Sequence, residues 1–320
     1  MDGFRLDAVP YLVEEDGRLA HTAGTHAFVH DYAAYIHRVA PDAFTIGEVW
    51  DSTGAMLPYY PDQLDAYFAF EVSNAILEAV RTGSAHKLLP PVLRLQRGLP
   101  ADRWAPFLRN HDQTRTLTEL GGDVARAKLA ATLLLTLPGL PFVYYGEEIG
   151  MTGDKPDERL RTPMQWSRAP SAGFTRGTPW EPLQPDSLTA NVEAQDADPA
   201  SLLNLYRRLI HLRAEHPALG AGALVPLVAS NDAVAAYLRR AGDRVVLVVA
   251  NLGSVALSGV TLTSEERVMQ AERYAPTSLL GDLAAASLRV GPDGRIQGYV
   301  PLRSLGPMES YLFELAAGSR

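Results

Sequence analysis

The sequence predicts an α/β domain over residues 1–217 and a separate all-β domain over residues 218–320. In the first part, short apolar runs alternate with segments whose apolar residues recur at helical spacing, which is typical of parallel strands joined by helices. From Gly220 onward, short strand-like runs are separated only by turn residues, which indicates an antiparallel sheet. At 320 residues the chain is long enough to bury the cores of one or two domains.

The first predicted strand, residues 1–9 (MDGFRLDAV), holds the first candidate site residue. Alternation along a strand predicts an apolar face formed by Phe4, Leu6 and Ala8. The opposite face then carries Gly3, Arg5, Asp7 and Val9. An arginine held beside an aspartate lowers the pKa of that aspartate and keeps it ionised, which suits Asp7 to act as a carboxylate nucleophile. For this pair alone, a salt bridge at the end of a strand would be the favoured interpretation.

The next segments predict a loop, a helix and a second strand. Residues 10–26 are polar with scattered glycines, and residues 26–39 then show helical spacing that we expect Pro41 to end. The apolar positions of this helix are Phe28, Tyr32, Tyr35, Ile36 and Val39. Residues 43–50 form a short apolar run with β-branched residues, typical of a buried parallel strand with Glu48 near its carboxyl end.

The remaining elements of the α/β part are predicted from the same signals. They are a loop at 51–65, a strand at 66–72, a helix at 73–81 with Ser73 as a possible N-cap, a segment broken by Pro90-Pro91 and Gly98-Leu99-Pro100, a strand at 103–109, a helix at 123–137 closed by Pro138-Gly139, and a last strand at 140–145. Residues 150–200 lack periodicity, and a loop this long is usually functional or disordered. Residues 202–213 predict an amphipathic helix with Leu203, Tyr206, Ile210 and Leu212 or their neighbours inside.

The all-β part contains six predicted strands. They span residues 225–228, 233–239, 244–251, 258–262, 298–302 and 309–314.

Two more carboxylate motifs follow the first strand in order: FTIGEVW at 44–50 and FLRNHD at 107–112. Together with GFRLD at 3–7, these segments resemble the alpha-amylase family of glycoside hydrolases (the family 13 type), over residues 1–217 and less distinctively to the C-terminus. The resemblance places the motifs on strands 4, 5 and 7 of a (β/α)8 TIM barrel and implies a C-terminal antiparallel β-sandwich. The family's strand-3 motif, D-x-V-x-N-H, is absent, and a whole barrel takes roughly 250 residues. We therefore expect a partial barrel, strands 4 to 8 with their helices, in an N-terminally truncated chain.

The resemblance implies roles for the motif residues. Asp7 would be the catalytic nucleophile, Glu48 the general acid and then the general base, and Asp112 the residue that stabilises the transition state. Arg5 would position Asp7, and His111 would hydrogen-bond the sugar. Desolvation of Glu48 between Gly47 and Trp50 could raise its pKa enough to retain a proton. We expect the Asp7 and Glu48 carboxyls to lie roughly 5 Å apart, the spacing of retaining enzymes.

Other residues near the motifs are candidate substrate contacts. Asn110 belongs to the third motif, and Trp50 and Trp166 are the aromatic residues best placed to stack on sugar rings. Arg161 begins RTPMQW (161–166), a segment similar to one in alpha-glucosidases, oligo-1,6-glucosidases and trehalose synthases of the family. Arg161 could contact sugar or pair with one of the glutamates at 147–148, which we expect to anchor structure.

Composition narrows the classes of partner. The net charge of −8 argues against nucleic-acid and anionic-membrane surfaces, and no apolar run is long enough to span a bilayer. With no cysteine and no metal-ligand motif, we expect no metal site and no cofactor for the chemistry, although the resemblance allows a structural calcium whose ligands are not identifiable here. The compartment is left open, and the unpaired edges of a partial barrel could lead to self-association.

Four functions follow from these observations. The first is a retaining hydrolase of α-1,4-glucans such as starch and maltooligosaccharides, which could be inactive as this chain alone. Pro10-Tyr11 after the nucleophile resembles trehalose synthases and related oligosaccharide-acting enzymes, whereas GEVWDS resembles the intermediate alpha-amylase branch. Trehalose synthase and alpha-glucosidase are therefore alternatives within the family. A non-catalytic sugar-binding or structural remnant is the alternative of another class.

Overall fold

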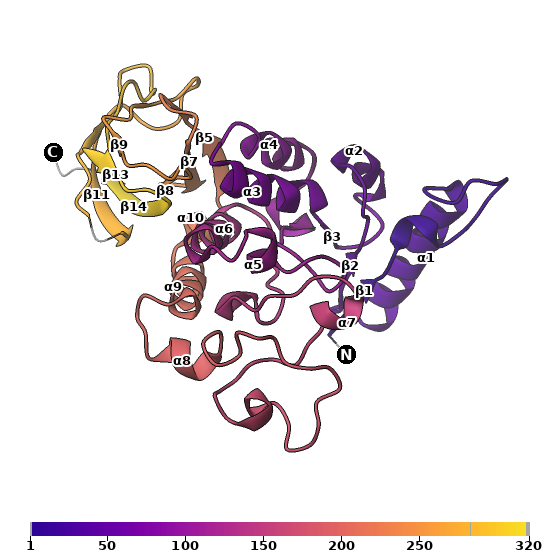
Figure 1. Cartoon of the computed structure of the whole chain (residues 1–320). Coiled ribbons are helices and arrows are strands. Elements are labelled where there is room, and N and C mark those ends of the chain that lie inside the picture. The colour runs from indigo at the N-terminus through magenta and orange to yellow at the C-terminus, as the bar shows by residue number, and fades with distance from the viewer. Residues whose placement is uncertain (1, 282, 318–320) are drawn as a thin grey trace. The chain divides into compact units, whose positions relative to one another are not determined.

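The computed structural model describes residues 2–281 and 283–317 (Figure 1). The chain divides into two compact units. The first comprises Met1–Asn74, Pro90–Phe107 and Gly139–Phe142, and the second comprises Ala75–Leu89, Leu108–Pro138 and Val143–Arg320. The predicted boundary at 217/218 falls inside the second unit, shortly before its first antiparallel strand. Residues 1, 282 and 318–320, which the two predicted domains include, lie outside the described residues.

The first unit is built on a four-stranded parallel sheet. Its strands are β1 (Gly3–Leu6), β2 (Phe44–Gly47), β3 (Ala66–Phe68) and β4 (Trp104–Ala105), in the order β1-β2-β3-β4. Strands that are consecutive in the sequence are also adjacent in the sheet, and all three adjacent pairs are parallel. Parallel pairing brings the carboxyl ends of the strands to the same edge of the sheet.

Several predicted strands are shorter than their apolar runs. Helix α3 (Phe70–Thr82) begins two residues after β3, so Ser73 lies inside the helix, where its hydroxyl donates to Ala69 O, and does not cap it. Strand β4 ends at Ala105, before Pro106, which has no N–H to continue a ladder. Residues 140–145 are not a strand, although Leu140 N and Phe142 N still donate to the chain around β4, at Trp104 O and Pro106 O.

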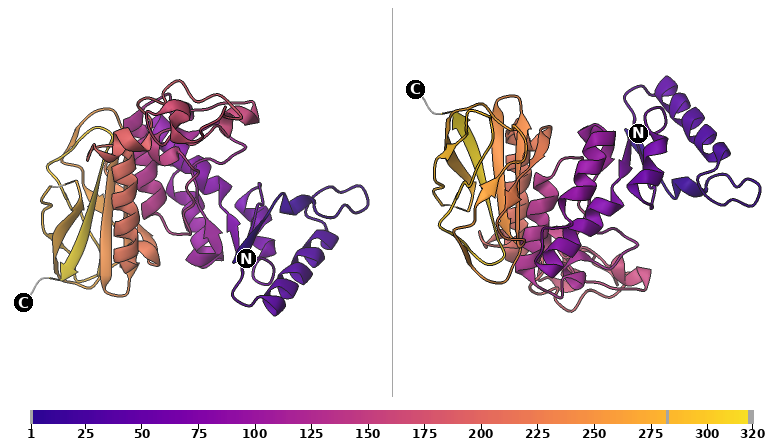
Figure 2. Two further views of the ribbon diagram at one scale, coloured as in Figure 1. Left: turned by 90° about the horizontal axis from the view of Figure 1, so that it is seen from below. Right: turned by 90° about the horizontal axis from the view of Figure 1, so that it is seen from above.

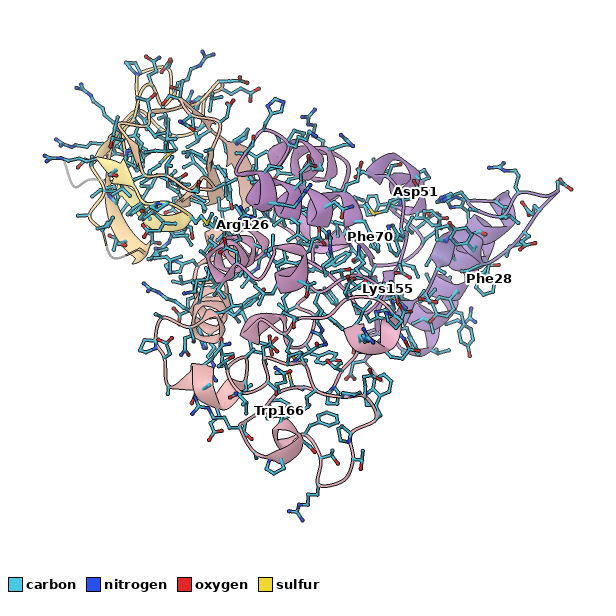
Figure 3. All side chains as sticks on the ribbon, viewed as in Figure 1. Phe28, Asp51, Phe70, Arg126, Lys155 and Trp166 are labelled. Carbon is cyan, nitrogen blue, oxygen red and sulfur yellow. The ribbon has the colours of Figure 1, made fainter. Side chains whose placement is uncertain are left out.

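Helix α1 (Ala23–Val39) ends where predicted but begins three residues earlier, because the Thr22 side chain accepts from Thr25 N and caps it. Of the apolar positions at helical spacing, Ile36 is buried, whereas Phe28, Tyr35 and Val39 are about half exposed. Figure 3 labels Phe28 on this helix. The buried positions are Thr25, Val29, Ala33 and Ile36. These smaller side chains also recur at helical spacing, and they let the helix approach its neighbours more closely. From the neighbouring strand, the Phe4 ring meets the Tyr32 ring edge-on, with centroids 6.5 Å apart.

Some elements of the first unit were predicted as loop or as broken chain. Residues 51–65 contain α2 (Thr53–Met56) and the 3-10 turn η2 (Leu57–Tyr59), and a further turn, η3, spans Ala101–Arg103. Helix α4 (Leu89–Gly98) contains Pro90 and Pro91 in its first turn. Proline is tolerated there because the first N–H groups of a helix have no partner within the helix.

The second unit contains helices α5 (Thr116–Glu119), α6 (Val124–Thr136), α9 (Leu202–Glu215) and α10 (Pro217–Gly220). Asp123 caps α6, which confirms the predicted helix, and α6 packs against α9. In α9, Leu209 is buried in place of Ile210, which is half exposed. The long segment before α9 holds four short elements: η4 (Glu147–Ile149), α7 (Asp157–Leu160), η5 (Pro170–Gly173) and α8 (Val192–Asp196).

The end of the second unit is antiparallel, as predicted. A six-stranded sheet has the order β12-β11-β14-β8-β7-β5, and two two-stranded ladders, β10-β6 and β13-β9, accompany it. The bounds are β5 (Ala223–Pro226), β6 (Val228–Ala229), β7 (Val234–Ala241), β8 (Arg244–Asn251), β9 (Leu257–Ser258), β10 (Leu262–Thr263), β11 (Arg273–Leu280), β12 (Leu288–Arg289), β13 (Ser304–Leu305) and β14 (Glu309–Ala317). Figure 2 shows α9 beside this sheet, where Arg208 Nη2 donates to Leu279 O at 2.6 Å.

Two strands of this sheet, β11 and β12, were not predicted, and residues 298–302 form only an isolated bridge at Tyr299. Strand β11 contains Pro276, which argues against a strand when only the sequence is considered. In the structure, β12 pairs only with Arg273 and Tyr274, so β11 is an edge strand at Pro276 and needs no N–H there.

Candidate active site

Arg5, Asp7 and Glu48 meet at the carboxyl ends of β1 and β2. The parallel register pairs Leu6 with Gly47, so Asp7 and Glu48 follow at the same edge of the sheet. Arg5 Nη1 lies 2.5 Å from Asp7 Oδ1, and Arg5 Nη2 lies 2.8 Å from Glu48 Oε2. One guanidinium therefore bridges both carboxyl groups, whereas the sequence predicted only its contact with Asp7.

Backbone hydrogen bonds hold Glu48 in this position. Glu48 N donates to Leu6 O at 2.9 Å, and Val9 N donates to Glu48 O at 3.0 Å. Ala8 takes a left-handed conformation, with φ of 45°, and its N–H donates to Glu48 Oε2 at 3.2 Å. The strand has already ended, so Val9 does not continue the polar face as predicted. It is fully buried and begins the turn η1 (Val9–Tyr11).

The two carboxyl groups have different surroundings. Glu48 is 6% exposed, whereas the Asp7 side chain is 72% exposed. Burial is the largest influence on the pKa of Glu48 and raises it. The hydrogen bond from Ala8 N–H and the positive charge of Arg5 lower this pKa, whereas the interaction with the Asp7 carboxyl raises it further. Glu48 therefore holds a proton more readily than an ordinary glutamate.

Glycines allow the strands of this site to come together. A Cβ on Gly3 would lie 2.1 Å from Phe44 O, a backbone atom of the neighbouring strand. A Cβ on Gly47 would lie 2.6 Å from a Leu64 methyl group and 3.2 Å from the Tyr67 ring. Gly3 of the first motif and Gly47 of the second therefore permit the close approach of β1 and β2 to their neighbours.

Trp50, two residues after Glu48, is half exposed and stacks on Phe70, with ring centroids 5.0 Å apart and planes 10° apart. The stacking leaves one face of the indole for a ligand. Beside it, Asp51 Oδ2 lies 3.2 Å from His21 Nε2, and His21 Nδ1 lies 3.0 Å from the Tyr59 hydroxyl. No motif in the sequence singled out His21.

The third motif lies in the second unit, in the chain that follows β4, and forms its own cluster. The Asn110 side chain accepts from Asp112 N at 3.0 Å, and His111 Nε2 lies 3.3 Å from Asp112 Oδ2. Arg161 Nη2 donates to Asp112 Oδ1 at 2.7 Å, and Arg161 Nε donates to His111 O at 3.1 Å. Arg161 therefore pairs with Asp112 and, at 3.3 Å, with Asp157.

Glu147 anchors structure. Thr116 Oγ1 donates to Glu147 Oε2 at 2.7 Å, and the Tyr206 hydroxyl donates to Glu147 Oε1 at 2.9 Å, which ties η4 to α5 and α9. Burial raises the pKa of Glu147 to about 7. Both oxygens are committed to these internal bonds, so Glu147 is not available for catalysis.

A hollow of about 390 Å³ lies in the second unit beside Arg161. We call it the aromatic pocket; it is lined by Tyr145, Glu148, Arg161, Thr162, Pro163, Met164, Trp166, Phe174 and Trp180. Of these residues, the sequence predicted only Arg161 and Trp166 as substrate contacts. Trp166 lies in the long segment before α9, as Figure 3 shows.

The predicted residues therefore form two groups. Arg5, Asp7, Glu48 and Trp50 belong to the first unit, whereas Asn110, His111, Asp112, Arg161 and Trp166 belong to the second. Within each group the structure brings the charged members into direct contact, as described above.

The described residues contain no group of three or more histidine or acidic side chains arranged to hold a metal ion, so no calcium ligands are assigned. In the same part of the chain, no helix has the length and apolar character needed to cross a bilayer.

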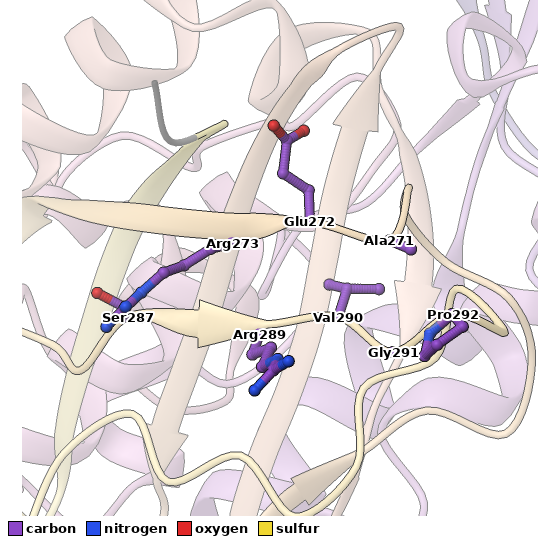
Figure 4. A pocket seen from close by; sticks show the side chains of 8 residues that line it. All are labelled: Ala271, Glu272, Arg273, Ser287, Arg289, Val290, Gly291 and Pro292. Carbon is purple, nitrogen blue, oxygen red and sulfur yellow. The ribbon is translucent and has the colours of Figure 1, made fainter. Parts of the chain in front are cut away.

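A larger hollow, of about 660 Å³, lies at β11 and β12, where Arg273, Ser287 and Arg289 line it (Figure 4). No residue of the three motifs contributes to it.

Comparison with known proteins supports the resemblance that the motifs suggested. The family model described as alpha amylase, catalytic domain, matches residues 1–222. Alpha-amylase 3 of Dictyoglomus thermophilum is 32% identical over 263 residues, which cover 80% of this chain and 50% of that protein. Trehalose synthase of Thermus thermophilus is 35% identical over 301 residues, which cover 79% of this chain and 31% of that protein.

Among solved structures, an alpha-amylase from H. orenii superposes with a TM-score of 0.76 at 28% identity, covering 98% of this chain and 61% of that chain. The chain thus spans half or less of the length of these two curated relatives. A (β/α)8 catalytic domain followed by a sheet domain is the architecture that this similarity indicates. The chain belongs to the alpha-amylase family of glycoside hydrolases.

Proposed function

We propose that this chain carries the nucleophile and the acid/base of a retaining glycoside hydrolase that acts on α-1,4-glucans such as starch and maltooligosaccharides. The observation that supports this most directly is the contact of Asp7 and Glu48 through one guanidinium. Two carboxyl groups that bind the two Nη atoms of one guanidinium are held close together, as the short carboxyl spacing of retaining enzymes requires.

The proposed reaction has two steps. In the first, Asp7 attacks the anomeric carbon while Glu48 gives its proton to the leaving oxygen, so the glycosidic bond breaks and a glycosyl ester forms on Asp7. In the second, Glu48 takes a proton from water, the water oxygen attacks the same carbon, and Asp7 leaves as a carboxylate. The burial of Glu48 raises its pKa and favours the protonated form that the first step needs.

For Asp112 we propose, from the family resemblance, the role of stabilising the transition state. The positive charge that develops on the sugar in the transition state is stabilised by a nearby carboxylate. Asp112 is oriented by Arg161, His111 and Asn110, so it is held ready to accept hydrogen bonds from sugar hydroxyls.

We further propose that the four parallel strands correspond to strands 4 to 7 of an eight-stranded barrel, with residues 140–145 following the course of strand 8. The exposed apolar positions Phe28, Tyr35 and Val39 of α1 fit a helix that a further barrel segment would cover. In that case the isolated chain self-associates through this face. Size-exclusion chromatography tests this proposal, and a sharp monomer with cooperative melting would contradict it.

Trehalose synthase is the second candidate, supported by Pro10-Tyr11 and by the 35% identity to a relative of that name. Product analysis with a complete enzyme carrying these motifs separates the candidates. Release of short oligosaccharides from starch, with retained α-configuration by NMR, supports the hydrolase. Conversion of maltose into trehalose favours the synthase, terminal glucose alone favours an alpha-glucosidase, and no turnover favours a non-catalytic remnant.

A further inference from the structure

The hollow at β11 and β12 lies in the antiparallel part of the second unit, and no residue of the three motifs lines it. Its volume of about 660 Å³ lies in the roughly 300–1,000 Å³ range of small-molecule sites. Its lining residues belong to β11, β12 and the chain directly beside these strands: Ala271, Glu272, Arg273, Ser287, Arg289, Val290, Gly291 and Pro292 (Figure 4). Two neighbouring segments of one sheet therefore form this lining.

Two arginines lie opposite each other in the hollow. The antiparallel register pairs Arg273 of β11 with Arg289 of β12. Directly paired residues project their side chains from the same face of a sheet, and two like charges in such a pair destabilise it. Within residues 2–281 and 283–317, neither guanidinium forms an ion pair with a carboxylate. This part of the sheet therefore holds two positive charges together without a negative charge from the described residues to balance them.

Glu272 also lines the hollow, but its carboxylate does not lie between the arginines. Val290 N donates to Glu272 O at 2.9 Å, so the ladder continues to the residue before β11, and alternation directs Glu272 to the face opposite Arg273. Figure 4 shows these two side chains on opposite sides of the strand. Glu272 lines a second hollow together with Arg240 and Tyr274, and Tyr274 belongs to the buried core of the sheet. The arginines therefore face solvent on the other side.

The side chains of the hollow favour a ligand with a phosphate group. A guanidinium is planar and binds phosphate oxygens with two parallel hydrogen bonds. Two guanidinium groups match a phosphate monoester, which carries about two negative charges at neutral pH. The Ser287 hydroxyl is a further donor in the lining. Ala271 and Pro292 are uncharged, so the rest of the hollow can accommodate an uncharged organic group attached to the phosphate.

We propose that this hollow binds a small phosphate monoester, with the phosphate group between Arg273 and Arg289. The bound phosphate supplies the negative charge that the arginine pair lacks, so binding stabilises the pairing of β11 with β12. An apolar ligand would leave the two positive charges unbalanced, and a cationic ligand would be repelled. The proposal does not depend on the proposed hydrolase activity, because the hollow shares no residue with the candidate active site.

The test measures binding to the 320-residue chain by calorimetry at neutral pH and low ionic strength. Glucose 6-phosphate serves as the probe ester, and it should bind saturably to one site and raise the melting temperature. Inorganic phosphate should bind more weakly, because it lacks the organic group, and glucose should not bind at this site. Added sodium chloride should weaken the binding of the ester, because it screens the charges of exposed arginines.

Two substitutions locate the site. Arg289→Gln should weaken binding of the ester at least about tenfold, since it removes one bidentate contact and half of the positive charge. The same change should not lower the melting temperature of the free chain, because it also removes the repulsion between the paired arginines. If Arg289→Gln lowers it nevertheless, Arg273→Gln decides by the same binding criterion. Arg303→Gln is the matched control, since Arg303 is exposed in the same sheet part and does not line the hollow.

The outcomes separate the ester from other anions. Tenfold weaker binding in Arg289→Gln with unchanged binding in Arg303→Gln supports the site. Undetectable binding of the ester, unchanged affinity in the folded hollow variant, or an equal loss in Arg303→Gln would overturn it. Equal affinity for inorganic phosphate would reject the ester in favour of a simple phosphate ion.

Discussion

Replacing Glu48 by glutamine should separate its chemical role from its place in the structure. Glutamine can still accept the hydrogen bond that Ala8 N–H donates to Oε2 at 3.2 Å. It has no proton to give to a leaving oxygen, and it removes the negative charge that lies 2.8 Å from Arg5. We therefore expect Glu48→Gln to keep the fold, to leave Arg5 paired with Asp7, and to lose both the proton donation of the first step and the proton acceptance of the second.

The size of the effect depends on the leaving group. General acid catalysis contributes about 10²–10⁴-fold, or about 3–5 kcal/mol of activation free energy. In a complete enzyme carrying these motifs, Glu48→Gln should lower kcat for maltotriose by that factor. A glucosyl fluoride needs no proton to leave, so its first step should survive. The second step lacks its base, so the glucosyl ester on Asp7 should accumulate.

Mass spectrometry after a pulse of α-glucosyl fluoride measures the intermediate. The added hexose should lie on the peptide that contains Asp7, and Asp7→Asn should abolish turnover of both substrates. Asp31→Asn, which changes a carboxylate with an 86% exposed side chain on α1, serves as the control and should behave as the parent. A hexose on another peptide, or equal loss of both substrates in Glu48→Gln, would refute the assignment.

Three further predictions concern packing, pH and substrate orientation. Gly3→Ala places a Cβ 2.1 Å from Phe44 O and should destabilise the fold by about 1–3 kcal/mol in urea unfolding; an unchanged midpoint would contradict this. Burial raises the pKa of Glu147 from 4.5 to about 7, so the native state binds the proton more tightly, and stability should fall by about 3 kcal/mol as the pH rises from 4.5 to 7. In Glu147→Gln the free energy of unfolding should therefore change less between pH 5 and pH 8 than in the parent protein. An equal change in the two proteins would contradict this prediction. Arg161→Lys keeps the charge but loses the planar contact with Asp112, so kcat/KM for maltotriose in a complete enzyme should fall at least about tenfold, whereas a change below about twofold would reject an orienting role.

The sequence predicted the contacts within the first motif better than those between motifs. The spacing of Arg5 and Asp7 along one strand brings them side by side without any information from elsewhere. The contact of Arg5 with Glu48 requires the register that pairs Leu6 with Gly47, which depends on two segments about forty residues apart. Arg161 shows the same limit: its position suggested either sugar or a neighbouring glutamate, and folding placed it on Asp112.

The sequence pattern also did not predict which face of helix α1 is buried. In α1 the larger apolar residues, such as Phe28 and Tyr35, suggested the core, yet the structure buries Val29 and Ala33. Both stripes recur at helical spacing, and only the space available beside the neighbouring elements selects between them. Strand β11, which contains Pro276, was not predicted either, because whether proline is tolerated in a strand depends on which neighbour that strand lacks.

The sequence by itself determined the division into a parallel and an antiparallel part, several helices and strands of each, and the three carboxylate motifs that indicate the family. These features depend on local periodicity and on residue types at short spacing, which a linear pattern contains. Only the tertiary structure decided that Glu48 is buried while Asp7 is open, and that Trp166, Phe174 and Trp180 line one pocket. Burial and pocket lining depend on segments distant in the chain, because solvent is excluded only when those segments pack together.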